Sequence, residues 1–216
     1  MTTLYFTRHG ESVANAADRE AAERPKEWDR LSERGWEQAR GLGERLREVE
    51  PELIVASNMR RAQETAAGIA EVLDLPIETD PDLHEVRQSD AFYASSPDFG
   101  NTGTLYWMPD APPDFAEPGA ESFEQIVARV KGVQERLATR AAEQRVVAVS
   151  HFGFLHFFLG RILFGEEFAP RHLRPLYQAA HDNTGITVFS HRERWIMDGL
   201  DFGGWVLETW NDRAHL

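Results

Sequence analysis

Residues 4–12 read Leu4-Tyr5-Phe6-Thr7-Arg8-His9-Gly10-Glu11-Ser12, a short apolar run that leads directly into a polar loop. A run of this kind predicts a buried strand whose carboxyl end delivers the loop to one edge of a sheet. The loop begins with an arginine and a histidine, and Gly10 allows the backbone to approach a ligand closely. We therefore expect the first strand to carry a candidate site at its carboxyl end.

The remainder of the chain alternates between helical and extended patterns. Apolar residues recur at three- and four-residue spacing over 35–49 and 121–142, which indicates amphipathic helices. Residues 53–57 and 145–150 contain continuous apolar runs, typical of strands buried on both faces. The alternation predicts an α/β fold, a three-layer sandwich with a largely parallel central sheet. The other expected elements are helices at 59–75 and 154–164, an edge strand at 77–79, and a closing pair of strands at 185–190 and 195–197.

The composition is that of an ordinary globular chain and excludes several classes of protein. The 216 residues fit one domain, since a domain typically holds roughly 100–200 residues. No cysteine is present, which excludes disulfides, thiolate catalysis and cysteine-ligated zinc. A net charge of -13 disfavours nucleic acid as a partner, because polyanion binding requires clustered Lys and Arg. With neither a signal-peptide pattern nor an apolar run long enough for a bilayer, we expect a cytoplasmic protein without a membrane segment.

The periodicity disappears between residues 86 and 118, where proline and aromatic residues are concentrated. An irregular stretch of this length is unusual in a compact domain and is often functional. We interpret 86–118 as a cap over the site, within a single domain that spans 1–216. The alternative is an irregular excursion that packs on the core. If the segment is a cap, its aromatic residues favour a substrate with an apolar or planar portion.

Three predicted strand ends carry polar residues: His9, then Ser57 followed by Arg60-Arg61, and His151. In parallel α/β sheets, ligands bind outside the carboxyl ends of the strands, so these residues are expected to converge. A neutral imidazole is a nucleophile that can attack phosphorus, and an arginine binds phosphate oxygens through two parallel hydrogen bonds. The convergence predicts a phosphate site, although an Arg-His pair taken alone also fits a structural histidine.

Four polar motifs follow one another along the chain. They are Arg8-His9-Gly10-Glu11-Ser12 with Asn15, Leu31-Ser32-Glu33-Arg34-Gly35, the run 57–66, and Val149-Ser150-His151. Together they resemble the histidine phosphatase superfamily, which includes the cofactor-dependent phosphoglycerate mutases, and the resemblance spans most of the chain. It implies the phosphoglycerate mutase-like sandwich. One departure is Phe152, where members of the family commonly have glycine, and a bulky residue there is expected to narrow the pocket or alter a backbone contact to phosphate.

The resemblance implies roles for individual residues. His9 is the expected nucleophile and His151 the second histidine of the phosphate pocket. Glu85 is the expected general acid, with Asp90 as the second choice and a solvated surface carboxylate as the alternative interpretation of Glu85. No metal or other cofactor is implied, because arginine and histidine supply the positive charge. The residues expected to bind the substrate are Arg8, Asn15 and Arg61.

These roles predict a phosphomonoester hydrolase that acts through a phosphohistidine at His9 on a small phosphorylated metabolite. The extended motif that follows the acid in mutases is absent, which favours a phosphatase. The alternatives are phosphoglycerate mutase-type phosphoryl transfer and a non-catalytic phosphate-binding protein that keeps the pocket. Among the other polar residues, His156 is expected to be a core histidine, and Asn183 and Thr184 precede a late strand and are candidates to approach the pocket.

Overall fold

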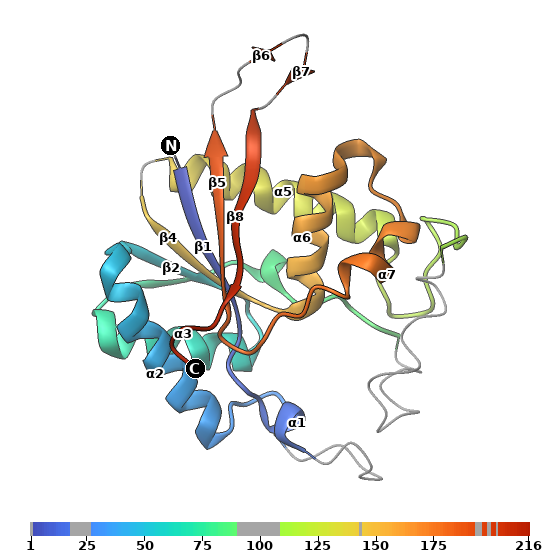
Figure 1. Ribbon diagram of the computed structural model, residues 1–216. Coiled ribbons are helices and arrows are strands. Elements are labelled where there is room, and N and C mark those ends of the chain that lie inside the picture. The colour runs from blue at the N-terminus through green and yellow to red at the C-terminus, as the bar shows by residue number, and fades with distance from the viewer. Residues whose placement is uncertain are drawn as a thin grey trace.

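The centre of the molecule is a six-stranded sheet in the order β3-β2-β4-β1-β5-β8 (Figure 1). The computed structural model describes residues 2–17, 27–89, 109–142, 144–192, 196–197, 200–201 and 203–216. The strands of the sheet are β1 (Thr2–Arg8), β2 (Leu53–Ala56), β3 (Ile77–Thr79), β4 (Val146–Ser150), β5 (Ile186–Arg192) and β8 (Gly204–Asp212).

Strand direction divides this sheet into two parts. The strands β3, β2, β4 and β1 are mutually parallel, and Phe6 on β1 lies opposite Ala148 on β4. β5 runs antiparallel to β1, and β8 runs antiparallel to β5. Every residue of β2 and β4 is buried, as expected of parallel strands covered on both faces. The predicted α/β fold with a largely parallel sheet is therefore confirmed.

Helices cover both faces of the sheet (Figure 1). Alternate strand residues belong to two separate cores, because successive side chains of a strand point to opposite faces. In one core, Phe6 packs against Phe154 and Phe158 of α6. In the other, Ile54 and Val147 join residues of α2 and α3. The result is the predicted three-layer sandwich. The main helices are α2 (Glu33–Leu46), α3 (Arg60–Leu73), α5 (Phe123–Ala141) and α6 (Phe152–Phe164).

Several short elements were not predicted, because a single helical turn contains too few residues to show a period. They lie in the connections between the larger elements. They are α1 (Val13–Ala16), α7 (Leu173–Leu176), and 3-10 turns at Arg47–Val49, Pro81–Leu83, Gly165–Glu167 and Pro170–His172.

The predicted pairing of 185–190 with 195–197 is wrong. β5 covers the first segment, but its partner in the sheet is β8. The second segment contains β6 (Ile196–Met197), which pairs with β7 (Leu200–Asp201) in a separate two-stranded sheet. β8 is at most half-buried, and its apolar run Trp205-Val206-Leu207 gives way to Glu208-Thr209, so its sequence signal is weaker than that of the buried strands.

The predicted cap, 86–118, lies mostly outside the described residues. Only 86–89 and 109–118 of this segment are described, and Asp90, the second choice for the acid, is not. The assignment of this segment as a cap stays a prediction. None of the helices in the described part of the chain has the length and apolar character needed to cross a bilayer.

Candidate active site

The carboxyl ends of the parallel strands bring the predicted residues to one edge of the sheet. Arg8 ends β1 and His9 follows it, Ser57 follows β2, and His151 follows β4. These three strands are neighbours in the order β2-β4-β1. Glu85 lies on the same side, beyond β3 and one 3-10 turn. The site therefore occupies the position where open α/β sheets bind ligands.

His9 is held through both its backbone and its ring. Its backbone N–H donates to the Ser150 carbonyl at 2.9 Å. Nδ1 lies 2.7 Å from the Gly10 carbonyl oxygen, which only accepts, so we assign the proton to Nδ1. Nε2 then has a lone pair, and it accepts a hydrogen bond from Nε of Arg61 at 3.0 Å. This is the tautomer in which Nε2 is the nucleophilic atom.

The surroundings of the histidine pair keep both rings neutral. Burial lowers the pKa of His9 well below its ordinary value; the charges of Arg61 and Arg8 lower it further, and the Gly10 hydrogen bond partly opposes them. Burial also lowers the pKa of His151 well below its ordinary value, and Arg61 and His9 add to the effect. The two ring centroids are 5.2 Å apart. A neutral His9 is the form required for attack on phosphorus.

Arg61 lies in the first turn of α3, and Asp29 holds its guanidinium. Nη1 of Arg61 is paired with the Asp29 carboxylate, and the guanidinium carbon lies 5.7 Å from the centroid of the Trp28 ring. Asp29 also accepts from the backbone N–H of Arg60 at 3.0 Å. It thereby caps α3, whose own N-cap, Met59, makes no side-chain hydrogen bond. With Nη1 on Asp29, Nε of Arg61 is directed to His9.

The loop after His9 packs tightly on α2 and α3. Thr65 Oγ1 accepts from the Gly10 N–H at 2.9 Å and donates to the Arg61 carbonyl at 2.7 Å. A Cβ on Gly10 would lie 2.7 Å from the Gly35 carbonyl oxygen, and a Cβ on Gly35 would lie 2.1 Å from the Glu11 carbonyl oxygen. Only glycine fits at either position. The close contact between the first and second motifs therefore fixes the backbone beside the nucleophile.

Arg8 lies between a carbonyl group and an aromatic ring. Its Nη1 donates to the His181 carbonyl at 2.8 Å, and its guanidinium carbon is 5.5 Å from the centroid of Phe152. The Phe152 ring also packs against Tyr177. Burial lowers the pKa of Arg8, and the charge of Glu85 is the main opposing effect. Phe152, the departure from the family pattern, thus lies beside one of the two pocket arginines.

Two nitrogen atoms in this pocket are buried without a hydrogen-bond partner among the described residues: Nε of Arg8 and Nδ1 of His151. Nε2 of His151 is 2.9 Å from Ser57 Oγ, which itself accepts from the Met59 N–H at 3.2 Å. Because Ser57 Oγ already accepts one hydrogen bond, we assign its hydroxyl proton to the bond with Nε2 and the proton of His151 to Nδ1. Buried donors are normally satisfied, so two unsatisfied donors in one pocket favour an acceptor-rich ligand such as phosphate.

Glu85 lies at the amino-terminal end of α6. Its carboxylate accepts from the backbone N–H groups of Val86 at 2.8 Å and of Gly153 and Phe154 at 3.2 Å. The positive end of a helix stabilises a carboxylate at this place. A Cβ on Gly153 would lie 2.7 Å from Oε1 of Glu85, so glycine is needed for this approach. The structure does not support the alternative of a freely solvated surface carboxylate.

Asn183 does approach the pocket. Its Nδ2 donates to the His9 carbonyl at 2.9 Å and lies 3.3 Å from Oδ1 of Asn15. Asn15 is exposed and forms a capping box with Ser12 at the start of α1. Thr184 is buried, and its hydroxyl donates to the Asn183 carbonyl at 2.7 Å. Asn183 therefore ties the amino-terminal end of β5 to the loop that carries His9.

Arg60 does not join the pocket residues, and His156 is the core histidine that the sequence predicted. Arg60, the neighbour of Arg61, is exposed and pairs with Glu64 at 2.7 Å. His156 is fully buried, and its ring nitrogens lie 2.7 and 2.8 Å from two backbone carbonyl oxygens, as expected of a core histidine. No group of three or more His, Asp or Glu side chains in the described ranges is arranged to hold a metal ion. The positive charge of the pocket comes from Arg8 and Arg61.

The sequence interpretation missed the residues that orient the pocket. Thr65 had a usable signal, because it follows Arg61 by one helical turn and must share its face of α3. Asp29 and His181 come from loops far from the motifs they contact, and no spacing in the sequence connects them to Arg61 or Arg8. Such contacts depend on the tertiary arrangement alone.

A buried histidine pair, flanked by two arginines and a carboxylate at the strand ends of a parallel α/β sheet, defines a class of phosphate-binding sites in which histidine is the potential phosphoryl carrier. The family model of the histidine phosphatase superfamily (branch 1) matches residues 4–213. The chain belongs to this superfamily.

Relatives within the superfamily have more than one activity. A metal-independent phosphoserine phosphatase of Arabidopsis thaliana is 28% identical and covers 100% of this chain and 84% of its own length. A probable phosphoglycerate mutase of Erwinia tasmaniensis is 27% identical and covers 100% of this chain and 95% of its own length. Among solved structures, a mycobacterial glucosyl-3-phosphoglycerate phosphatase is similar with a TM-score of 0.71 and 25% identity, covering 98% of this chain and 99% of that one.

Proposed function

We propose that this chain is a phosphomonoester hydrolase that transfers the phosphoryl group of a small metabolite to His9 and then to water. The observation that carries the proposal is the state of His9: a buried, neutral ring with its proton on Nδ1 and its Nε2 lone pair beside Arg61. Phosphatases of small phosphorylated metabolites among the relatives support the same reaction class.

In the first step, Nε2 of His9 attacks the phosphorus atom in line with the ester oxygen. The phosphorus–oxygen bond breaks, and its electron pair stays on the departing alkoxide. Glu85 takes up a proton beside the negative charge of the bound substrate, donates it to that oxygen and releases the alcohol. Arg8, Arg61 and His151 bind the phosphoryl oxygens while charge is redistributed, His151 through its Nδ1–H.

In the second step, water attacks the phosphohistidine. Glu85, now a carboxylate, takes a proton from the water as the new phosphorus–oxygen bond forms. The phosphorus–nitrogen bond breaks, its electron pair returns to Nε2 of His9, and inorganic phosphate leaves. The amide oxygen of Asn15 accepts from Asn183 beside His9, which leaves the amide N–H groups of Asn15 to donate to an outer oxygen of the phosphoryl group.

Hydrolysis is favoured over mutase chemistry because the extended motif that follows the acid in mutases is absent from this chain. A panel of small phosphate monoesters tests this choice. We expect stoichiometric release of inorganic phosphate from at least one alkyl phosphate. Interconversion of phosphoglycerates without phosphate release would contradict the assignment. Binding of phosphate without turnover of any ester, aryl phosphates included, would favour a non-catalytic phosphate-binding protein.

The proposal also includes two predictions from the sequence: that residues 86–118 form a cap over the site, and that the protein is cytoplasmic.

A further inference from the structure

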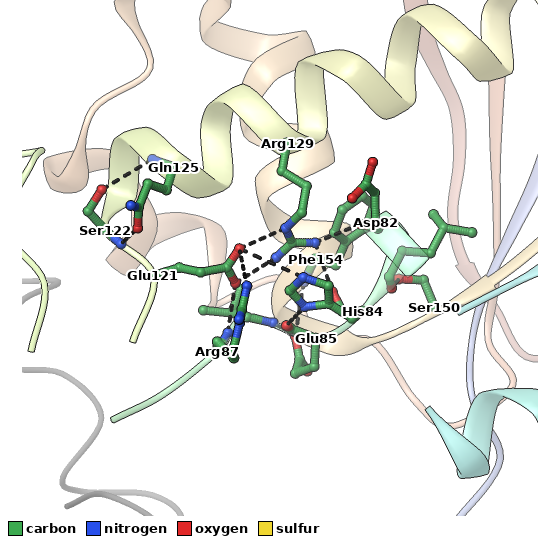
Figure 2. Close-up of polar contacts among 12 residues, drawn as sticks. Asp82, His84, Glu85, Arg87, Glu121, Ser122, Gln125, Arg129, Ser150 and Phe154 are labelled. Carbon is green, nitrogen blue, oxygen red and sulfur yellow. Dashed lines mark hydrogen bonds and ion pairs between the residues drawn. The ribbon is translucent and has the colours of Figure 1, made fainter. Parts of the chain in front are cut away.

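The segment that carries Glu85 is held from outside the pocket by a buried ion pair, Glu121 with Arg129 (Figure 2). Arg129 lies on α5, and Glu121 lies just before this helix. Their side chains form two parallel hydrogen bonds, from Nε to Oε1 at 2.8 Å and from Nη2 to Oε2 at 2.9 Å. Only 8% of the Arg129 side chain and 7% of the Glu121 side chain are exposed. Burying such a pair has a large desolvation cost, so stability alone is a weak reason for its presence.

The pair bonds to the backbone on both sides of Glu85. Nη1 of Arg129 donates to the carbonyls of Asp82 at 2.7 Å and His84 at 2.9 Å. The Glu121 carboxylate accepts from the Arg87 N–H at 2.9 Å, and the Glu121 N–H donates to the Arg87 carbonyl at 3.1 Å. Backbone groups before and after the acid are therefore attached to one rigid unit.

Other contacts complete the support of this segment. The Ser150 hydroxyl, at the end of β4, donates to the Leu83 carbonyl at 2.7 Å, and Nδ1 of His84 lies 2.6 Å from the Glu85 carbonyl. Each backbone carbonyl from residue 82 to residue 85 thus has a donor. The Arg129 guanidinium carbon also lies 5.2 Å from the centroid of Phe154, whose N–H bonds the Glu85 carboxylate. Arg129 therefore contacts both the backbone that carries Glu85 and the helix residue that bonds its carboxylate.

A second arginine of α5, Arg136, forms exposed ion pairs that contrast with the buried pair of Glu121 and Arg129. Arg136 bonds the carboxylates of Asp80 at 3.0 Å and Asp82 at 2.8 Å, and its side chain is 47% exposed. It reaches the start of the same segment, but it contacts side chains there instead of the backbone around Glu85. Arg136 therefore offers a matched control on the same helix.

We propose that Glu121 and Arg129 are positioning residues that hold the general acid in place for protonation of the leaving group. The inference rests on the proposed function, in which Glu85 is that acid. Proton donation requires the acid within hydrogen-bond reach of the departing oxygen, and a displacement of about 1 Å can cost about 100-fold in rate. Loosening residues 82–87 should therefore impair the proton transfer, with little effect on phosphate binding.

The test replaces Arg129→Lys, which keeps the positive charge and removes the fork that makes four bonds at once. Phosphoenzyme formation is followed in single turnovers by rapid quench, with a simple alkyl phosphate and with p-nitrophenyl phosphate. The alkyl leaving group needs a proton, whereas p-nitrophenolate departs as a stable anion. We expect the rate from the alkyl phosphate to fall at least about tenfold and the rate from p-nitrophenyl phosphate to stay within about twofold, since general acid catalysis contributes only where protonation is needed.

Two sets of controls make the result specific. Arg136→Lys should leave both rates unchanged. Glu85→Gln should reproduce the selective loss on alkyl phosphates, and adding Arg129→Lys to Glu85→Gln should cause no further loss, because the two changes act through one proton transfer. If Arg129→Lys fails to fold, as judged by circular dichroism, the double replacement Glu121→Met with Arg129→Met removes both charges together and should give the same selectivity.

The outcomes separate the inference from the function on which it rests. If Glu85→Gln slows both substrates equally or neither, Glu85 is not the general acid and the proposed function fails at that residue. If Glu85→Gln is selective but Arg129→Lys and the double replacement act equally on both substrates, the pair is only structural and the inference is wrong. A selective loss in all of these variants supports it.

Discussion

His9 has two neutral tautomers, and its neighbour in the chain decides between them. The Gly10 carbonyl, 2.7 Å from Nδ1, only accepts, so the lone pair lies on Nε2. Arg61 then donates to that lone pair from Nε in the absence of substrate. A phosphoryl oxygen must compete for the same guanidinium, and the pairing with Asp29 keeps the guanidinium in the pocket during the exchange.

Asp29→Asn should weaken this orientation. In asparagine an NH2 group replaces one of the two oxygens, and this group cannot accept. The Arg60 N–H and the Arg61 guanidinium, which bond different oxygens of Asp29, therefore cannot both keep their acceptors. We expect kcat/KM for a phosphate monoester to fall about tenfold, which corresponds to about 1.4 kcal/mol. We also expect the partial loss of the α3 cap to lower the free energy of unfolding by about 0.5–2 kcal/mol. Steady-state kinetics and urea unfolding measure the two effects.

Glu27→Gln is the matched control for Asp29. Glu27 lies in the same turn, is 57% exposed, and pairs with Arg30 and Arg60 at the surface. Exposed pairs contribute about 0–1 kcal/mol, so kinetics and stability should both remain near wild type. Wild-type kcat/KM in Asp29→Asn would show that Arg61 does not need this support.

At the scale of the element, the amino-terminal turn of α6 binds the acid, and Gly153 makes the close approach possible. Gly153→Ala places a Cβ 2.7 Å from Oε1 of Glu85, so the carboxylate must move. We expect kcat on alkyl phosphates to fall about tenfold or more, because the acid is displaced. Gly153 is the second residue of α6, so alanine gains little of the roughly 1 kcal/mol by which it is favoured over glycine in a helix interior. Steady-state kinetics measure kcat, and circular dichroism measures the melting temperature.

Gly132→Ala on α5 serves as the comparison. A Cβ there meets only Nη1 of Arg136 at 3.4 Å. We expect a higher melting temperature and an unchanged kcat, measured by circular dichroism and steady-state kinetics. If Gly153→Ala kept the wild-type kcat on alkyl phosphates, the acid would not depend on its contact with α6.

The larger elements could be predicted because their environments are simple. α2, α3 and α5 each bury one stripe, and β2 and β4 are buried on both faces, so each shows the period of its class. β8 is an edge strand that covers the core only partly, through side chains such as Trp205 and Trp210. Its hydrophobic pattern in the sequence is correspondingly weak. The pairing of β5 with β8 across a separate hairpin depends on contacts that local periodicity does not encode.

At the scale of the whole molecule, the interior contains histidines that are kept neutral by burial. The pKa of His9 and His151 lies well below the ordinary value, and burial lowers the pKa of His181 to about 3. Below about pH 6.5 the unfolded chain binds protons that the folded chain does not, so stability must fall as the pH decreases. The loss of stability begins near the pKa of histidine in the unfolded chain. It continues as the pH falls, until the pH reaches the lower pKa of these histidines in the folded protein.

Urea unfolding at about pH 7.5 and about pH 5.5 measures this effect, because carboxylates stay ionised over that range. His181, with a pKa of about 3, should contribute roughly 1.3 kcal/mol to the loss of stability between these two pH values, and His9 and His151 should add to the loss in the same direction. His181→Gln should therefore reduce the difference by roughly 1.3 kcal/mol. Equal stability at the two pH values would mean that these rings take up protons in the folded protein as they do in the unfolded chain.

The site contains two kinds of residue: pocket groups that the sequence predicted and supporting groups that it did not. The groups of the predicted pocket stand on strand ends and on one helix start, where short motifs mark them, and the structure brings Arg8, His9, Arg61 and His151 together. The supporting groups, such as Asp29 and Arg129, contact them from segments with no motif of their own. Their roles follow only from the way the layers pack.

The central claim is that His9 carries the phosphoryl group, and trapping that intermediate tests it most directly. The protein is quenched in alkali during turnover of a phosphate monoester, digested, and sequenced by mass spectrometry, since phosphohistidine survives alkali and is lost in acid. We predict a phosphoryl group on the peptide that contains His9, and neither phosphoenzyme nor turnover in a folded His9→Ala variant. Phosphate on another residue, or hydrolysis by His9→Ala at the wild-type rate, would contradict the account.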